Sequence, residues 1–144
     1  MKWLILLHVL GASVWAGGHL VLSLGFLPQA LKQRDLSIIQ NFEKYFERVG
    51  IPALLLQVIT GVWMALLYVP VSSWLSLASP HHVYLWVKFG LLVGTLALAI
   101  HARFFLIPKL TIEKLPELAF HIVLVTVLAV AFVVTGLSFR FVYF

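Results

Sequence analysis

Long apolar stretches, separated by short polar segments, dominate the pattern of the chain. Four such stretches occur, and the membrane spans that they predict cover about residues 3–26, 50–69, 84–107 and 118–139. Each is close to the ~20 residues that a helix needs to cross about 30 Å of hydrocarbon. A helix also satisfies its own backbone groups, as lipid requires. The pattern therefore predicts an all-α integral membrane four-transmembrane-helix bundle, with residues 1–144 as a single transmembrane domain.

Residues 36–49, between the first two spans, place apolar and charged side chains on opposite sides at helical spacing. Phe42 belongs to the apolar side and Glu43 to the charged side. We expect an amphipathic helix here that lies in the membrane interface. A helical extension of the second span fits the same spacing, but Gly50 and Pro52 favour a break.

The composition indicates that lipid, rather than water, surrounds most of this chain. Hydrophobic residues make up 62% of it and charged residues 10%, with a mean hydropathy of +1.07. The absence of cysteine excludes disulfides, thiolate metal sites, iron–sulfur clusters and covalently attached c-type haem. The net charge is +5, but no basic run occurs, so we expect the lipid bilayer and no nucleic acid as a partner.

Lysine and arginine are distributed unevenly between the two sides of the predicted bundle. Loops one and three, with the adjoining span ends, contain Lys32, Arg34, Lys44, Arg48, Arg103, Lys109 and Lys114. The opposite side contains Lys2, Lys88 and Arg140. The positive-inside rule places the richer side in the cytoplasm. We therefore expect a bacterial inner (cytoplasmic) membrane protein with both termini outside.

Four histidines lie inside the predicted spans, namely His8, His19, His101 and His121. Ionisable residues inside spans face the bundle interior and often carry function, although interhelical hydrogen bonding is the simpler interpretation of any single one. Every acidic residue falls in a predicted loop, which disfavours a carboxylate-based proton or cation pathway. The four histidines together favour ligation of a metal or of haem iron.

Spacing and depth divide these histidines into two layers. His8 and His19 share one helix face but lie ~16 Å apart along the axis, which suits two stacked cofactors rather than one ion. His19, His101 and His121 fall at one depth near the cytoplasm. His19 and His101 are therefore the expected axial pair of a haem b, with His121 in reserve and Arg103 near the propionates. Glycines beside these histidines fit either a flat porphyrin or close helix contacts.

The outer layer consists of His8 and Lys88, each a few residues into its span. A second haem or a substrate site there would give one or two haems per chain. Without such a site, the simpler interpretation of Lys88 is a side chain that extends to the lipid headgroups.

Several motifs resemble those of the CopD-like (copper resistance protein D-like) membrane family. They are Leu7 to His19, Phe42 to Pro52, Thr60-Gly61, Tyr84 to Phe89 and Arg103 to Pro108. The context of His8 and Lys88 also resembles the HemJ-type protoporphyrinogen oxidases, haem b membrane proteins, and this resemblance gives both residues a functional role. His19 and His101 are not general features of either family, which indicates a distinct branch.

These observations predict a haem b-binding, cytochrome b-like integral membrane redox protein that transfers electrons within or across the membrane, from a quinol or from a redox partner protein. A copper transport or resistance protein and a HemJ-like porphyrinogen oxidase are the alternatives, and whether the chain is an enzyme stays open. Copper(I) prefers sulfur ligands, and the chain has only two methionines. A homo-oligomer is compatible with all three functions.

Overall fold

The structure, a computed structural model, describes residues 2–76 and 79–141. Its α-helices are α1 (Lys2–Val21), α2 (Leu27–Gln33), α3 (Ser37–Tyr68), α4 (Pro80–His101) and α5 (Leu115–Phe141). Two π-helical turns, η1 (Leu22–Phe26) and η3 (Ala102–Leu106), continue α1 and α4. Short 3₁₀ turns complete the connections, namely η2 (Val71–Ser73), η4 (Ile107–Lys109) and η5 (Ile112–Lys114).

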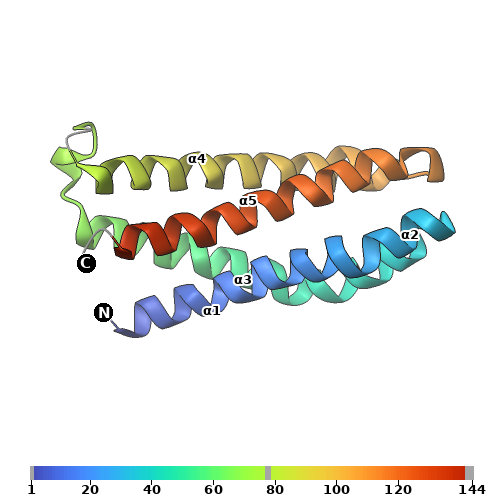
Figure 1. The fold of residues 1–144 in the computed structure, drawn as a ribbon, viewed down its shortest axis with the longest axis horizontal. Coiled ribbons are helices and arrows are strands. Elements are labelled where there is room, and N and C mark those ends of the chain that lie inside the picture. The colour runs from blue at the N-terminus through green and yellow to red at the C-terminus, as the bar shows by residue number, and fades with distance from the viewer. Residues whose placement is uncertain (1, 77–78, 142–144) are drawn as a thin grey trace.

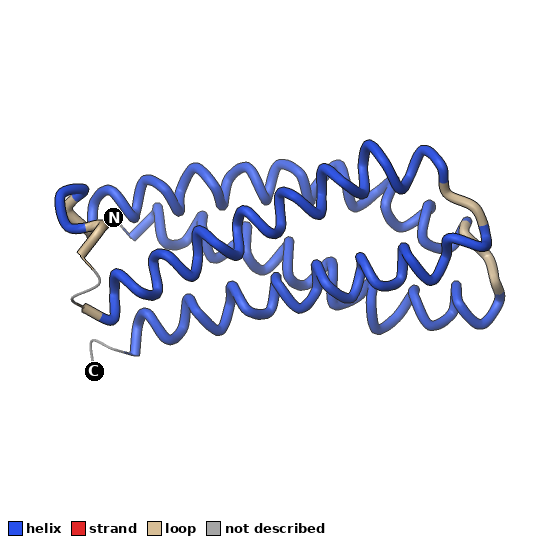
Figure 2. Tube along the Cα trace, turned by 90° about the horizontal axis from the view of Figure 1, so that it is seen from above, coloured by secondary structure: helices blue, strands red, loops and turns tan. Residues whose placement is uncertain are grey.

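Within the residues that the structure describes, four helical segments are long and apolar enough to cross a membrane, which confirms the predicted bundle of four spans. They cover Lys2–Gln33, Ser37–Tyr68, Pro80–Lys109 and Ile112–Ser138. The start of α1 and the end of α5 lie at the same end of the bundle, as four crossings require (Figure 1). We call this the outer end, and we call the end with the α2–α3 and α4–α5 connections the inner end (Figure 2).

The four spans form two antiparallel hairpins. α1 packs along α3, α4 packs along α5, and contacts between α1 and α5 hold the two hairpins together. Most of the apolar surface of the chain faces outward, as expected of helices surrounded by lipid. The largest buried cluster lies at the inner end, where Leu22, Leu27, Ile39, Leu106 and Leu118 meet.

The amphipathic segment 36–49 is helical but is not a separate interfacial helix, so that part of the prediction is corrected. α3 runs without interruption from Ser37 to Tyr68, with Pro52 inside it. Buried Ile39 belongs to the inner cluster and Phe42 packs against it, so the apolar face of the segment is occupied by the bundle. This contact outweighs the single backbone hydrogen bond that Pro52 removes.

Both π-helical turns occur near the inner end, and each ends two residues before a proline. The N–H of Leu27 bonds to the Leu22 carbonyl, and the N–H of Ile107 bonds to the Ala102 carbonyl. Pro28 and Pro108 follow within two residues and have no N–H to continue the regular ladder. Such wide turns are frequent at functional sites.

Two of the glycines in α1 let α3 approach closely. A Cβ at Gly11 would lie 2.8 Å from Cγ of Gln57, and one at Gly18 would overlap the Phe46 ring. Gly17 has open space around it. Close helix contact, rather than room for a porphyrin, therefore accounts for Gly11 and Gly18.

Candidate functional site

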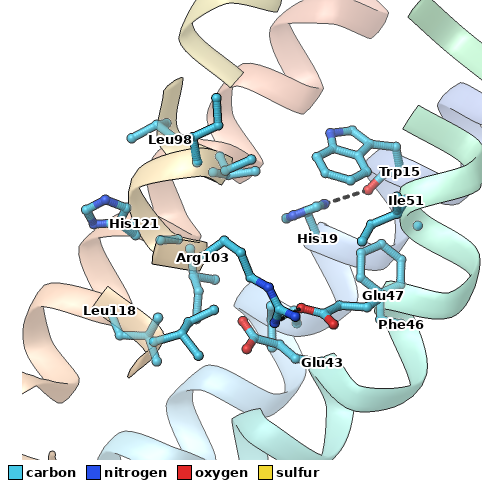
Figure 3. A pocket seen from close by; sticks show the side chains of 18 of the residues that line it. Trp15, His19, Glu43, Phe46, Glu47, Ile51, Leu98, Arg103, Leu118 and His121 are labelled. Carbon is cyan, nitrogen blue, oxygen red and sulfur yellow. Dashed lines mark hydrogen bonds and ion pairs between the residues drawn. The ribbon is translucent and has the colours of Figure 1, made fainter. Parts of the chain in front are cut away.

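A cavity of about 330 Å³ opens between the four spans near the inner end. Its wall is largely apolar, and its polar side chains come from all four spans, namely His19, Glu43, Glu47, Arg103 and His121. We call it the inner cavity. Figure 3 shows His19 extending into the cavity from α1. The two glutamates lie on the α3 side, and the Arg103 side chain extends toward them from the opposite side.

His19 is held in one orientation and one tautomer. Its Nδ1 donates a hydrogen bond of 2.8 Å to the Trp15 carbonyl (Figure 3). The ring also packs on Trp15, with centroids 4.4 Å apart, and meets Phe46 edge-on at 5.4 Å. Because Nδ1 carries the proton, Nε2 keeps its lone pair as a metal ligand.

His101 and His121 form a hydrogen-bonded pair. Nδ1 of His121 donates to the Glu117 carbonyl at 3.3 Å, so its Nε2 accepts from Nδ1 of His101 at 3.0 Å. Both nitrogens of His121 are thus engaged. His101 does not line the inner cavity, although His121 does. The structure therefore brings His101 to His121 and does not bring it to His19 across the cavity.

Arg103 makes an ion pair with Glu47, with Nη1 3.2 Å from Oε1. Glu43, one helical turn before Glu47, lines the same cavity. The cavity thus contains two carboxyl groups and one guanidinium. Glu47 already supplies Arg103 with a protein partner where a haem propionate was expected.

The two glutamates were missed as site residues because residues 36–49 were assigned to a loop. Glu43 and Glu47 have i, i+4 spacing and therefore share a helix face. Extending the second span through Glu43 would have placed both beside Arg103, which lies at the matching end of the third span. That spacing was the available signal.

The outer end contains His8, whose Nδ1 donates to the Thr60 hydroxyl at 2.8 Å. The Thr60 hydroxyl donates in turn to the Leu56 carbonyl at 2.6 Å, which fixes the direction of the first bond. His8 Nε2 therefore also keeps its lone pair. Nζ of Lys88 lies 3.8 Å from the position of a Cβ on Gly136, and its charge acts on His8. His8 and Lys88 thus belong to one outer polar cluster.

His82 bonds to Ser79 and Ser73 within the outer connection. Among residues 2–76 and 79–141, no group of three or more His, Cys, Asp and Glu side chains forms a ready metal cage.

Copper fits the donors of the inner cavity better as Cu(II) than as Cu(I). Its described lining offers one imidazole nitrogen and carboxylate oxygens, and no sulfur. Nitrogen and oxygen donors suit Cu(II), whereas Cu(I) is selected by thiolates and thioethers.

Comparison with known families assigns the chain to one of them. Residues 40–139 match the model of the family described as CopD, copper resistance protein D. The chain belongs to this family. The match includes α4 and most of α3 and α5, and therefore Glu43, Lys88, Arg103 and His121. His8 and His19 precede the matched segment. The comparison shows the CopD relationship and does not show the HemJ resemblance.

No curated protein and no solved structure matches the chain. The family relationship therefore rests on the match to residues 40–139.

Proposed function

We propose that this CopD-family protein handles copper within the membrane, with the inner cavity as the site where the metal binds. Support comes from one observation above all. His19 presents an unprotonated Nε2 in a cavity that also contains Glu43, inside a bundle of membrane-spanning helices. Copper is the substrate in this proposal, a transported or sequestered ion rather than a resident cofactor.

His19 and Glu43 have different tasks in this function. The imidazole supplies a nitrogen ligand whose direction is fixed by the Trp15 carbonyl. Glu43 supplies a carboxyl oxygen, and the charge that it gains when a cation displaces its proton offsets part of the cost of bringing that cation into an apolar cavity. The apolar wall strengthens both interactions by excluding water.

Copper uptake into proteoliposomes tests this function. Glu43→Gln should lower uptake by at least about tenfold, because even partners behind a ligand are worth 10- to 100-fold in metal affinity. Lys44→Gln is the matched control, since it changes the charge of the next, exposed residue. Equal uptake by the parent and Glu43→Gln would refute the assignment of the carboxylate.

A haem b function is the second candidate, and the direction of His19 Nε2 into an apolar cavity favours it. The residues do not fit a bis-histidine haem as they stand. His101 lies off the cavity, and both nitrogens of His121 are engaged. The absorption spectrum of the purified protein separates the two functions, because haem b gives a Soret band and copper does not. Electron transfer from a quinol and a HemJ-like oxidase activity both require bound haem, so either function requires that this band is present.

The cytoplasmic position of the inner end remains our proposal, supported by the excess of Lys and Arg in loops one and three. It implies an inner-membrane protein with its termini outside. Single cysteines at Ser37 and Ser79 of the cysteine-free chain should be labelled from opposite sides of intact cells. External labelling of Ser37→Cys alone would reverse the orientation.

A further inference from the structure

The ion pair between Glu47 and Arg103 lies at the rim of the inner cavity. Nη1 of Arg103 and Oε1 of Glu47 are 3.2 Å apart, and both residues line the cavity. The two side chains are 61% and 38% exposed, respectively, so the pair is not deep inside it. Figure 3 shows Arg103 extending across the cavity toward the glutamates of α3.

This ion pair connects elements that belong to different hairpins. Glu47 is on α3, which packs along α1, whereas Arg103 is on η3, which continues α4 and lies beside α5. The pair therefore bridges the two hairpins at the side where the cavity opens. Breaking it removes a bridge without removing the α1–α5 contact that holds the bundle together.

Arg103 also sits at a point where its helix is irregular. It is the second residue of the π-helical turn η3, which ends shortly before Pro108. The wide turn and the missing N–H of the proline weaken the regular ladder there. Arg103 can consequently move with less backbone cost than a residue in the middle of α4.

We propose that the Glu47–Arg103 ion pair is the gate of the inner cavity. Paired, it closes the rim and keeps a guanidinium charge in the path of an arriving cation. A cationic substrate opens it by competing with Arg103 for the carboxylate of Glu47. That the substrate is copper rests on the proposed function, but the opening itself does not.

Labelling of a cysteine behind the rim tests the gate. Ala99 lines the cavity one helical turn before Arg103, and Ala99→Cys is a small change in a chain without other cysteines. The reagent should be a small neutral maleimide, so that altered local charge does not itself change the rate. Glu47→Gln and Arg103→Gln should each accelerate labelling roughly twofold to fivefold, the range available from a partly exposed ion pair.

Two further variants give the test its control and its rescue. Arg48→Gln removes an exposed cation next to Glu47 and should leave the labelling rate unchanged. The exchanged pair Glu47→Arg/Arg103→Glu should return the rate toward that of the parent. Circular dichroism should confirm helical content in each variant. If the exchanged pair does not fold, the single variants and Arg48→Gln decide the outcome.

Equal labelling rates in the parent and both single variants would overturn the gate, as would an equal acceleration by Arg48→Gln. The copper proposal would be refuted by a different result. A gate seen by labelling in a protein that binds no copper would leave the gate intact and remove its substrate.

Discussion

Nδ1 of His101 lies 3.0 Å from Nε2 of His121, and the two rings stack with an interplanar angle of 16°. The bond joins α4 to α5. His121 is oriented by the Glu117 carbonyl, so each proton in this chain of bonds has a defined position. The pair therefore acts as a hydrogen-bonded connection within the second hairpin, beside the inner cavity.

Replacing one member of this pair should destabilise the hairpin. His121→Phe leaves His101 Nδ1 without its acceptor, so we expect a loss of about 1–2 kcal/mol in the free energy of unfolding. The double variant His101→Phe/His121→Phe should recover part of that loss, because two stacked apolar rings leave no unmatched donor. Thermal unfolding in detergent measures both. A single variant as stable as the parent would show that the hydrogen bond contributes nothing.

Adjacent glycines in α1 should respond oppositely to a methyl group. Gly18→Ala places a Cβ into the Phe46 ring, which is itself fixed against Trp15 and His19, so we expect a loss of about 1–3 kcal/mol. Gly17→Ala meets nothing within 4 Å and should be neutral or stabilising, by up to about 1 kcal/mol from helix propensity. Thermal unfolding compares the two. Equal losses would contradict the close approach of α1 and α3.

The sequence was sufficient to predict the four spans, because lipid demands long apolar helices and these segments have almost no charge. Depth along a helix was also predictable, since it follows from the rise per residue. His19 and His121 indeed line one cavity. Rotation about the helix axis was not predictable. It depends on which neighbour each helix packs against, and this is why His101 meets His121 rather than His19.

The continuity of a helix through a local irregularity could not be predicted from the sequence either. Gly50 and Pro52 favoured a break, yet contacts of Ile39 and Phe42 at the inner end keep α3 continuous. The same continuity brings Glu43 into the cavity. A pattern of residue types does not show that a tertiary contact outweighs a local preference.

The turn between α2 and α3 should be sensitive to acid. The Asp35 carboxylate accepts the Ser37 N–H at 2.8 Å, and the hydrogen bonds from Ser37 lower the pKa of Asp35 below its usual value. A folded-state pKa below the unfolded one means that the stabilisation is present above the unfolded value of ~3.9 and is lost as the pH falls through the folded value. Asp35→Asn should therefore show less change in melting temperature between pH 5 and 3 than the parent, measured in detergent. An identical pH dependence would contradict the role of this carboxylate.

The outer cluster of His8 and Lys88 should contribute to function rather than only to anchoring. His8 Nε2 is left as a potential ligand by the Thr60 hydrogen bond, and the Lys88 charge acts on the same ring. We expect His8→Ala and Lys88→Ala each to lower copper uptake into proteoliposomes. Lys2→Ala, which removes a cation at the same end, should not. Unchanged uptake in both cluster variants would leave the outer end structural. A red protein that loses one of two haems in His8→Ala would instead support the haem function.

Equilibrium binding of Cu(II) to the purified protein tests the central claim most directly, with His19→Ala and His101→Ala as a matched pair. Both variants remove an intramembrane histidine near the inner end, but only His19 lines the inner cavity. We predict that His19→Ala weakens Cu(II) binding by at least about tenfold and removes nitrogen hyperfine structure from its paramagnetic resonance spectrum. His101→Ala should retain both. Cu(II) binding that is unaffected by His19→Ala, or lost equally in both variants, would contradict the inner cavity as the copper site.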